Sequence, residues 1–244
     1  MDIFGGNDLL RAVEPAVRPG FAGRLKVVAL DRGDVIYGAG DEVDRVWFPL
    51  SGLVGIQAGT SDGEAVESAI VGREGAIGAF EACGSRRFFA EAVVQIPGEA
   101  ARMPAAAYRD LFEVSPSLRT AVHRYVEQTI GETRQFVVCN SLHAVEARLA
   151  RLLLEALARA ALDHTLPLTH QALAEMLGAQ RTTVALIVSR LQRDGVLSGR
   201  RGTIKIEDEA ALERLACGCR QALVSARRQI GAASDPSCDA GVAA

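Results

Sequence analysis

The sequence predicts an α+β protein in which an N-terminal β-roll, a long helix and a C-terminal winged helix-turn-helix follow one another. Short β-branched or alternating runs punctuated by Gly, Asp and Pro fill residues 24–103. A helical apolar period then begins near Ser117, and a helix–glycine–helix pattern with a basic hairpin follows it. We therefore expect a β-roll domain over 1–116, a long connecting helix over 117–140, a winged domain over 141–230 and a disordered tail over 231–244.

The expected strands are short and lie close together in the chain. They fall in the runs LKVVAL, DVIYGAG, DRVWFPLSGLVGIQAG, EAVESAIV and AEAVVQIPGEAARM. The Asp-Gly pair in TSDGEA is typical of a hairpin turn. This spacing is that of an all-β sandwich or roll, preceded by one short helix at NDLLRAV.

The long helix is expected after a shorter one, PAAAYRDLFEVSP, which ends at Ser115-Pro116. Apolar and small side chains recur on it every three or four residues and form one stripe. A second copy of the helix is an economical cover for such a stripe, and packing on the β-roll of the same chain is the alternative. We assign to a dimer interface Leu118, Val122, Tyr125, Val126, Thr129 and Phe136.

The C-terminal part begins with an amphipathic helix, HAVEARLARLLLEALARAAL, and a linker, DHTLP. Thr169 is an expected N-cap for a helix that ends at Leu177, and Gly178 makes the turn. A second helix runs from Gln180 or Arg181 to about Asp194. Its core face is expected to hold Val184, Ile187, Val188 and Leu191.

The outward face of this second helix has the residue types that contact DNA. Arg181 can donate to guanine O6 and N7, and the helix N-terminus attracts a phosphate. The segment GVLSGRRGTIKIED predicts a hairpin that would place two arginines on the DNA backbone. The alternative is a small helical core with a solvated basic hairpin. The DNA-binding residues that we expect are Thr169, Gln180, Arg181, Thr182, Thr183, Ser189, Arg200 and Arg201.

The charge of the chain is divided unevenly. The net charge is −3, with 14 basic and 19 acidic residues in 1–140 but 13 and 11 in 141–244. An acidic total does not prevent nucleic-acid binding when a basic patch is local. The patch is expected over residues 169–206.

The cysteines do not suggest a disulfide framework, because the five are scattered and odd in number. No apolar run is long enough to span a membrane, and the first residues lack a secretory pattern, so we expect a reduced cytoplasmic protein with no membrane partner. Cys217 and Cys219 form a close pair without an accompanying His or Cys cluster. They are either redox-active thiols or two reduced cysteines, and we expect no metal site.

These features together resemble the Crp/Fnr family of bacterial transcription regulators. The most specific segments are LTHQALAEMLGAQRTTVALIVSRLQRDGVL and VGREGAIGAF…AVVQIPGEAARMP. The resemblance covers roughly residues 20–215. It implies a β-roll sensor like a cyclic nucleotide-binding domain, a homodimer joined along the long helix, and binding to a two-fold symmetric site on double-stranded DNA. RNA polymerase is a further partner that the resemblance allows.

The sequence departs from cyclic-AMP-responsive members of that family at two places. Their recognition helix has Arg-Glu-Thr-Val-Gly-Arg where this chain has RTTVAL, residues 181–186, so their DNA half-site is not transferred. Their glutamate that binds the ribose and their arginine that pairs with the cyclic phosphate have no clear counterparts here, which argues against a cyclic nucleotide. The effector is unidentified, and the residues assigned to its pocket are Arg73, Glu74, Gly78, Arg86 and Arg87.

Other sensors and other functions have less support. An N-terminal iron–sulfur sensor is not expected, because no cysteine precedes Cys83, and nothing marks His123 or His143 as a haem ligand. We predict no cofactor. A metal enzyme on the β-roll is not expected, since residues 24–103 contain no histidine. Two alternatives stay open: an adaptor whose winged domain binds a protein, and a DNA-binding protein that needs no effector.

Overall fold

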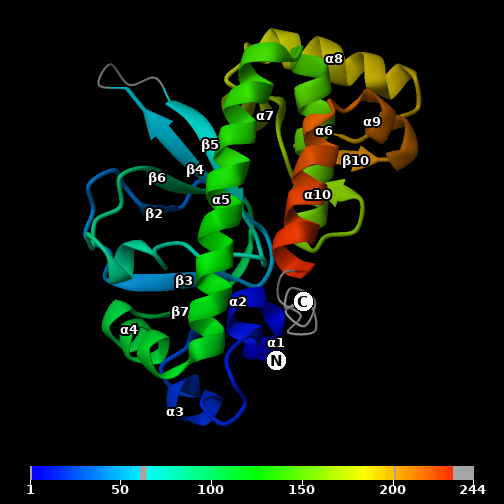
Figure 1. Cartoon of the computed structure of the whole chain (residues 1–244). Helices are drawn as coiled ribbons and strands as arrows, with labels where there is room; N and C mark the ends of the chain where they lie inside the picture. The colour runs from blue at the N-terminus through cyan, green and yellow to red at the C-terminus, as the bar shows by residue number, and fades with distance from the viewer. Residues whose placement is uncertain (1, 61–64, 201, 233–244) are drawn as a thin grey trace, which may run out of the picture.

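A computed structural model describes residues 2–60, 65–200 and 202–232. A β-roll, a long helix that runs the height of the molecule, and a helical C-terminal domain lie side by side (Figure 1). This confirms the α+β fold class. In the described part of the chain, no helix is both long and apolar enough to cross a membrane.

The β-roll is built from two antiparallel sheets that face each other across an apolar core. One sheet has the order β1-β7-β3, formed by Lys26–Leu30, Gly98–Pro104 and Arg45–Pro49. The other has the order β2-β6-β4-β5, formed by Val35–Tyr37, Glu91–Ile96, Leu53–Gly59 and Ala65–Val71. Each of the expected apolar runs therefore holds a strand, as the spacing predicted. The Asp-Gly turn between β4 and β5 lies outside the described residues.

Short helical segments accompany the strands of the roll. They are α1 (Ile3–Gly6), α2 (Asp8–Arg11), α3 (Arg18–Ala22), the 3-10 turn η1 (Glu81–Cys83) and α4 (Ala105–Val114). Asn7 holds α2 in place, because its side chain accepts from two backbone N–H groups of the helix and donates to the carbonyls of Pro49 and Gly75. The N-terminal segment around Asn7 is thereby fixed to the β-roll.

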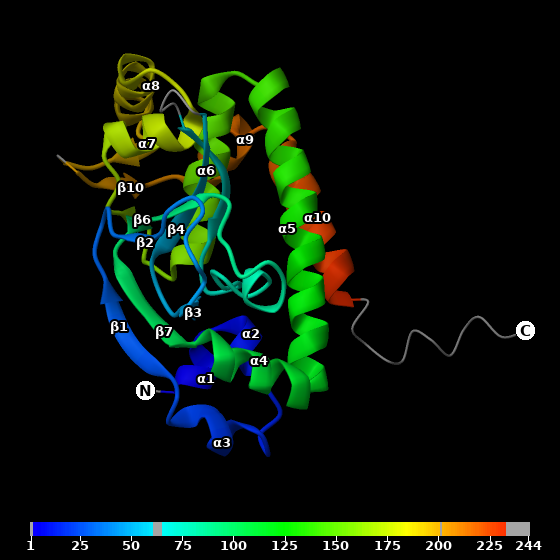
Figure 2. The same cartoon turned by 90° about the vertical axis from the view of Figure 1, so that its left-hand side faces the viewer.

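The long helix α5 (Pro116–Leu142) follows its N-cap Ser115, whose hydroxyl accepts from the N–H of Leu118. Figure 2 shows it standing beside the β-roll. Leu118, Val122 and Tyr125 are buried in the same core as the roll, and Val126 packs against that core. The assignment of Leu118, Val122 and Tyr125 to a dimer interface was therefore wrong, because their own β-roll already covers them.

Two other residues of that predicted stripe also have partners within the chain. Phe136 is buried, and the guanidinium of Arg151 lies 4.4 Å from the centre of its ring. Thr129 is half-buried and its hydroxyl donates to the carbonyl of Tyr125. The large apolar side chains that α5 leaves exposed lie on a different face: Ile130, Val137, Val138 and Leu142.

The C-terminal domain consists of α6 (Val145–Ala160), α7 (His170–Leu177), α8 (Arg181–Arg193), α9 (Glu209–Leu215) and α10 (Cys219–Ala232). A small sheet of order β8-β10-β9 joins Thr165–Leu166, Ile204–Ile206 and Leu197–Ser198. The strand β8 lies in DHTLP, which the sequence suggested was only a linker. The tail predicted from Gly231 onward begins inside α10, and residues 233–244 lie outside the described part.

The two domains are packed together and share apolar contacts. Leu53, Ile70 and Ile96 of the β-roll lie in the same buried cluster as the apolar faces of α6, α7 and α8. The last helix, α10, returns along α5 (Figures 1 and 2). A change in the roll can therefore reach the C-terminal domain through direct packing.

Candidate nucleic-acid interface and sensor cavity

Two helices joined by a glycine turn form the centre of the C-terminal domain. The Thr169 hydroxyl accepts a hydrogen bond of 3.0 Å from the N–H of Ala172, as expected of an N-cap. Gly178 ends α7 with φ 56° and ψ 45°, a left-handed conformation that favours glycine. These two local signals were visible in the sequence, and the structure confirms both.

Helix α8 has one buried face and one open face. Val184, Val188 and Leu191 are buried, and Ile187 is partly buried against the same core. On the open side, Arg181, Thr182 and Ser189 are exposed, whereas Thr183 is half-buried. Gln180 is the N-cap but its side chain makes no cap hydrogen bond, so the first N–H groups of α8 are free to bind a phosphate.

A groove of about 580 Å³ separates the start of α7, α8 and the hairpin β9–β10. Thr169, Arg181 and Arg200 all line it, although they are far apart in the sequence. Arg200 lies in the hairpin beside Gly199, as the wing was expected to place it; Arg201 falls outside the described residues. The groove thus brings two arginines and a helix start to one polar surface.

Leu186 was not assigned to this surface from the sequence. It lies on the open face of α8 with 74% of its area exposed. The 3.6-residue period places Leu186 on the same face of the helix as Thr182 and Ser189, so an apolar residue on a polar face was the signal in the sequence. An exposed leucine there can contact a thymine methyl group or an apolar protein surface.

The β-roll reaches this domain through the β4–β5 hairpin. A second groove lies between that hairpin and the helices, and Arg181 and Gln180 line it together with Val66. Strand β5 also packs against α7. The hairpin therefore lies beside the start of α8, where Arg181 contributes to both grooves.

A cavity of about 460 Å³ lies between the β-roll and α5. Its walls are mostly apolar, with Phe80, Phe88, Phe89 and Tyr125 among them. Glu81 also lines it, and burial raises the pKa of this carboxyl to about 7. The described residues that line the cavity include no Lys, Arg or His, so its chemistry favours a neutral, largely apolar molecule.

Comparison with known proteins agrees with both halves of this architecture. Residues 27–115 match the cyclic nucleotide-binding domain family, and residues 147–215 match the Crp-like helix-turn-helix domain family. The chain belongs to the Crp/Fnr family of transcription regulators. It is therefore a Crp/Fnr regulator with a helix-turn-helix DNA-binding domain, and its β-roll corresponds to the cyclic nucleotide-binding domain of that family.

Individual bacterial regulators resemble the chain over most of its length. The transcriptional regulator SdrP of Thermus thermophilus is 28% identical over 200 residues, which are 78% of this chain and 94% of that protein. The global nitrogen regulator of Synechocystis is 24% identical over 77% of this chain and 87% of its own length. A solved Crp/Fnr regulator from Thermus thermophilus is 26% identical, covers 78% of this chain and 98% of its own, and has a TM-score of 0.61.

The sensor residues assigned from the sequence fall mostly outside the cavity of this Crp/Fnr regulator. Gly78 lines the cavity, with φ 81°. Arg86 and Arg87 do not, and Arg87 instead donates to the carbonyl of Gly40. Arg73 and Glu74 are also absent from the cavity wall. The alignment from sequence could not tell which side chains of these turns point inward.

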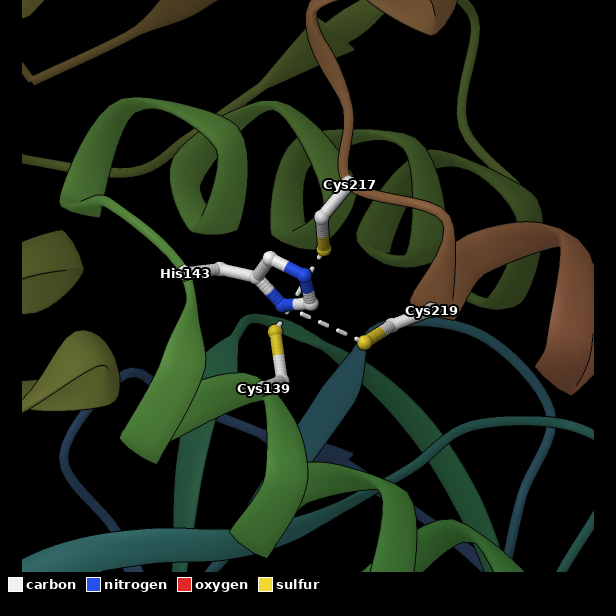
Figure 3. A group of neighbouring side chains, drawn as sticks. All are labelled: Cys139, His143, Cys217 and Cys219. Carbon is white, nitrogen blue, oxygen red and sulfur yellow. Dashed lines mark hydrogen bonds between the residues drawn. The ribbon is translucent and has the colours of Figure 1, made fainter.

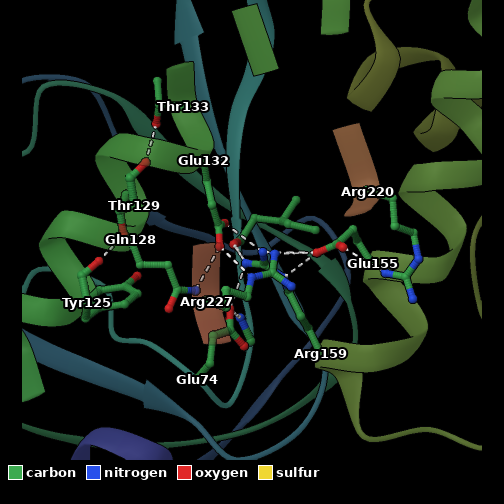
Figure 4. Close-up of polar contacts among 12 residues, drawn as sticks. Glu74, Tyr125, Gln128, Thr129, Glu132, Thr133, Glu155, Arg159, Arg220 and Arg227 are labelled. Atoms are coloured by element: carbon green, nitrogen blue, oxygen red, sulfur yellow. Dashed lines mark hydrogen bonds and ion pairs between the residues drawn. The ribbon is translucent and has the colours of Figure 1, made fainter. Parts of the chain in front are cut away.

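Glu74 belongs instead to a buried ion-pair network centred on Arg159 (Figure 4). Arg159, in α6, binds the carboxylates of Glu74, Glu132 and Glu155. Burial alone would raise the pKa of Glu155, but Arg159, Arg227 and Arg220 lower it to about 2. The network joins the β-roll, α5, α6 and α10, and no local pattern in the sequence predicts it.

The cysteines are arranged differently from the sequence expectation. Cys139 and His143, from the end of α5, lie against Cys219 at the start of α10 and Cys217 just before it (Figure 3). The statement that no His or Cys accompanies the Cys217–Cys219 pair was therefore wrong, because the fold brings two distant residues to it. Burial raises the pKa of Cys217 to about 12, which is the opposite of a reactive thiolate.

Proposed function

We propose that the protein is a dimeric, sequence-specific DNA-binding regulator whose affinity for DNA responds to a small effector in the β-roll. The observation that carries this proposal is the groove that Thr169, Arg181 and Arg200 share. It combines a helix start, a base-contacting face on α8 and a basic wing on one side of the domain. The side chains that would contact DNA phosphates and those that would contact base edges thus lie next to each other.

A selection from a random duplex pool at two salt concentrations tests this function. We expect enrichment of one palindromic sequence and a steep loss of affinity with salt, because Arg side chains displace counterions from phosphate. Binding without an enriched sequence would contradict sequence-specific recognition. No binding at either salt, with and without candidate effectors, would contradict the DNA-binding proposal itself.

The dimer is proposed to form through the solvent face of α5. Ile130 is 46% exposed, Val137 64% and Val138 42%, and all three lie on the side of α5 that the β-roll does not cover. A second copy would bury these apolar side chains and set two α8 helices at one DNA site. Gly131 lies beside them with open space where a side chain would stand, which permits a close approach of two helices.

Sedimentation equilibrium of Val137→Glu tests the dimer surface. We expect a monomer, because two glutamates would face each other across the interface. The matched control is Val114→Glu, which changes a 55% exposed valine at the end of α4 and should stay dimeric. A monomeric wild type, or dissociation in the control alone, would contradict this interface.

The effector is proposed to be uncharged and largely apolar, with a donor for Glu81. The wall of aromatic and small side chains supports this class, and the absence of a cation among its described residues argues against a cyclic phosphate. Thermal unfolding with cyclic AMP and cyclic GMP tests the second point. We expect no shift in Tm, whereas a saturable rise with either nucleotide would overturn the assignment.

An adaptor that binds a protein is the second candidate function, because Leu186 is apolar and exposed on α8. Salt dependence separates the two functions. Protein binding through Leu186 would vary little with salt, whereas DNA binding through Arg181 and Arg200 would vary steeply.

A further inference from the structure

Four side chains that bind metals well meet at the junction of the long helix and the last helix (Figure 3). Cys139 lies in the last turn of α5, and His143 is the residue that ends this helix. Cys219 is the first residue of α10, and Cys217 lies just before it. Residues four apart on a helix share a face, so Cys139 and His143 present their side chains together.

The distances between the candidate ligand atoms fit one small ion. The Sγ atoms of Cys139 and Cys217 are 3.4 Å apart, and Sγ of Cys219 is 3.5 Å from Nδ1 of His143. All four ligand atoms lie within 4.8 Å of one another. Tetrahedral Zn²⁺ with bonds of about 2.3 Å to sulfur and about 2.0 Å to nitrogen separates two sulfur ligands by roughly 3.8 Å and a sulfur from a nitrogen ligand by roughly 3.5 Å. A cluster of several irons would need the thiolates further apart.

The surroundings also suit a closed structural metal site. Cys139, Cys217 and Cys219 are buried, and Ala147 packs against them. The side-chain amide of Gln135, which is not itself a candidate ligand, donates to Sγ of Cys219 at 3.0 Å. Such a hydrogen bond orients the sulfur toward a bound metal. Closed sites with four protein ligands of sulfur and nitrogen are typical of structural zinc.

We propose that Cys139, His143, Cys217 and Cys219 bind one Zn²⁺ in a tetrahedral Cys₃His site. On binding, the three thiols lose their protons to solvent and each sulfur forms a bond to the ion, while neutral imidazole supplies the fourth bond. The site then has one negative charge in total.

The site would act as a clamp between two segments that are far apart in the sequence. It joins the end of α5, immediately before α6 begins, to the start of α10. Farther along α10, Arg227 binds Glu132 of α5, so the metal and this ion pair would hold the same helix at two points. Metal binding to a site that exists only in the fold contributes directly to folding stability.

The first test is the metal content of the full chain, purified under reducing conditions without added metal. Elemental analysis is expected to give one zinc per chain. Replacement by Co²⁺ is expected to give the strong d–d bands of a tetrahedral ion and sulfur-to-cobalt charge transfer. Zinc binding is also expected to release protons to a weak buffer. Iron with acid-labile sulfide, or no metal and no cobalt spectrum, would overturn the proposal.

Matched variants then test the ligands. Cys219→Ser and His143→Gln are expected to lower metal content at least tenfold or to change the cobalt spectrum. Cys83→Ser changes an exposed thiol of the β-roll, and His123→Gln changes a histidine on the same helix, so both should keep one zinc. Equal loss in these controls would overturn the assignment. If a ligand variant fails to fold, the cobalt spectrum of the wild type still decides the ligand set.

A disulfide between Cys139 and Cys217 is the competing outcome, because their sulfur atoms are close. Mass spectrometry after alkylation of the purified chain, with and without chelator, separates the two. Protection of three thiols that disappears with chelator supports zinc, and a disulfide that persists under mild reduction overturns it. These measurements do not involve DNA, so they succeed or fail independently of the DNA-binding proposal.

Discussion

Arg159 and Glu132 form an ion pair with 2.7 Å between Nη2 and Oε2, and both side chains are less than a tenth exposed. Arg159 belongs to the DNA-binding half and Glu132 to the long helix. Because Glu74 of the β-roll binds the same guanidinium, one buried cation contacts all three parts of the molecule. A rearrangement of the β-roll on α5 would therefore act directly on α6.

Glu132→Gln is expected to destabilise the fold by about 3 kcal/mol, because it removes one charge from a buried network and leaves Arg159 and Arg227 less compensated. Equilibrium denaturant unfolding measures this change. Asp110→Asn is the control, since its pair with Arg24 is exposed and worth at most about 1 kcal/mol. An equal loss of unfolding free energy in the two variants would show that the buried ion-pair network contributes no more to stability than the exposed pair.

Stability is expected to fall as the pH rises from about 4.5 to about 7, in part because of Glu81. Burial raises the pKa of its folded-state carboxyl from 4.5 to about 7. Its contribution is therefore fully present below the unfolded pKa and is lost as pH rises through the folded value. Tm measured across this range should vary less in Glu81→Gln than in the wild type. Glu99→Gln, at an exposed carboxylate, should leave the wild-type profile unchanged.

Arg181→Ala is expected to lower binding to the selected sequence more than binding to random DNA, because Arg181 is exposed at the start of α8. The loss of specific affinity should correspond to about 1–3 kcal/mol, as for one base contact. Titration of both duplexes measures it. Equal loss on the two would reject base recognition by this residue.

Arg200→Ala is expected to lower specific and random binding together, since a wing arginine contacts phosphate. The slope of log affinity against log salt should fall by about one unit. Arg32→Ala, an exposed arginine in a turn of the β-roll, should change neither quantity. An altered base preference in Arg200→Ala would show that the wing contacts bases instead.

Leu186→Ala is expected to weaken binding at one position of the selected sequence, where its side chain would contact a thymine methyl. Leu186→Arg should shift the preference there toward guanine. A repeat of the duplex selection with each variant measures both effects. Val35→Ala, at an exposed valine of the β-roll, is the control, and an unchanged preference with Leu186→Arg would place Leu186 away from the bases.

The amino-acid sequence alone determined the elements of this protein, because their signals are local. The cap of Thr169, the turn at Gly178 and the alternation in the β-strands depend on neighbouring residues, and all appear in the structure. Family resemblance followed from the same local patterns. Even Leu186 could be placed on the open face of α8 by its period.

Tertiary structure decided which surfaces meet. Periodicity predicts that α5 has an apolar face, but only packing shows that the β-roll of the same chain covers Tyr125. The strand β8 is too short for a pattern of its own and exists because β10 pairs with it. Cys139 and Cys217 are 78 positions apart, and no local property of either predicts the contact that the return of α10 along α5 creates.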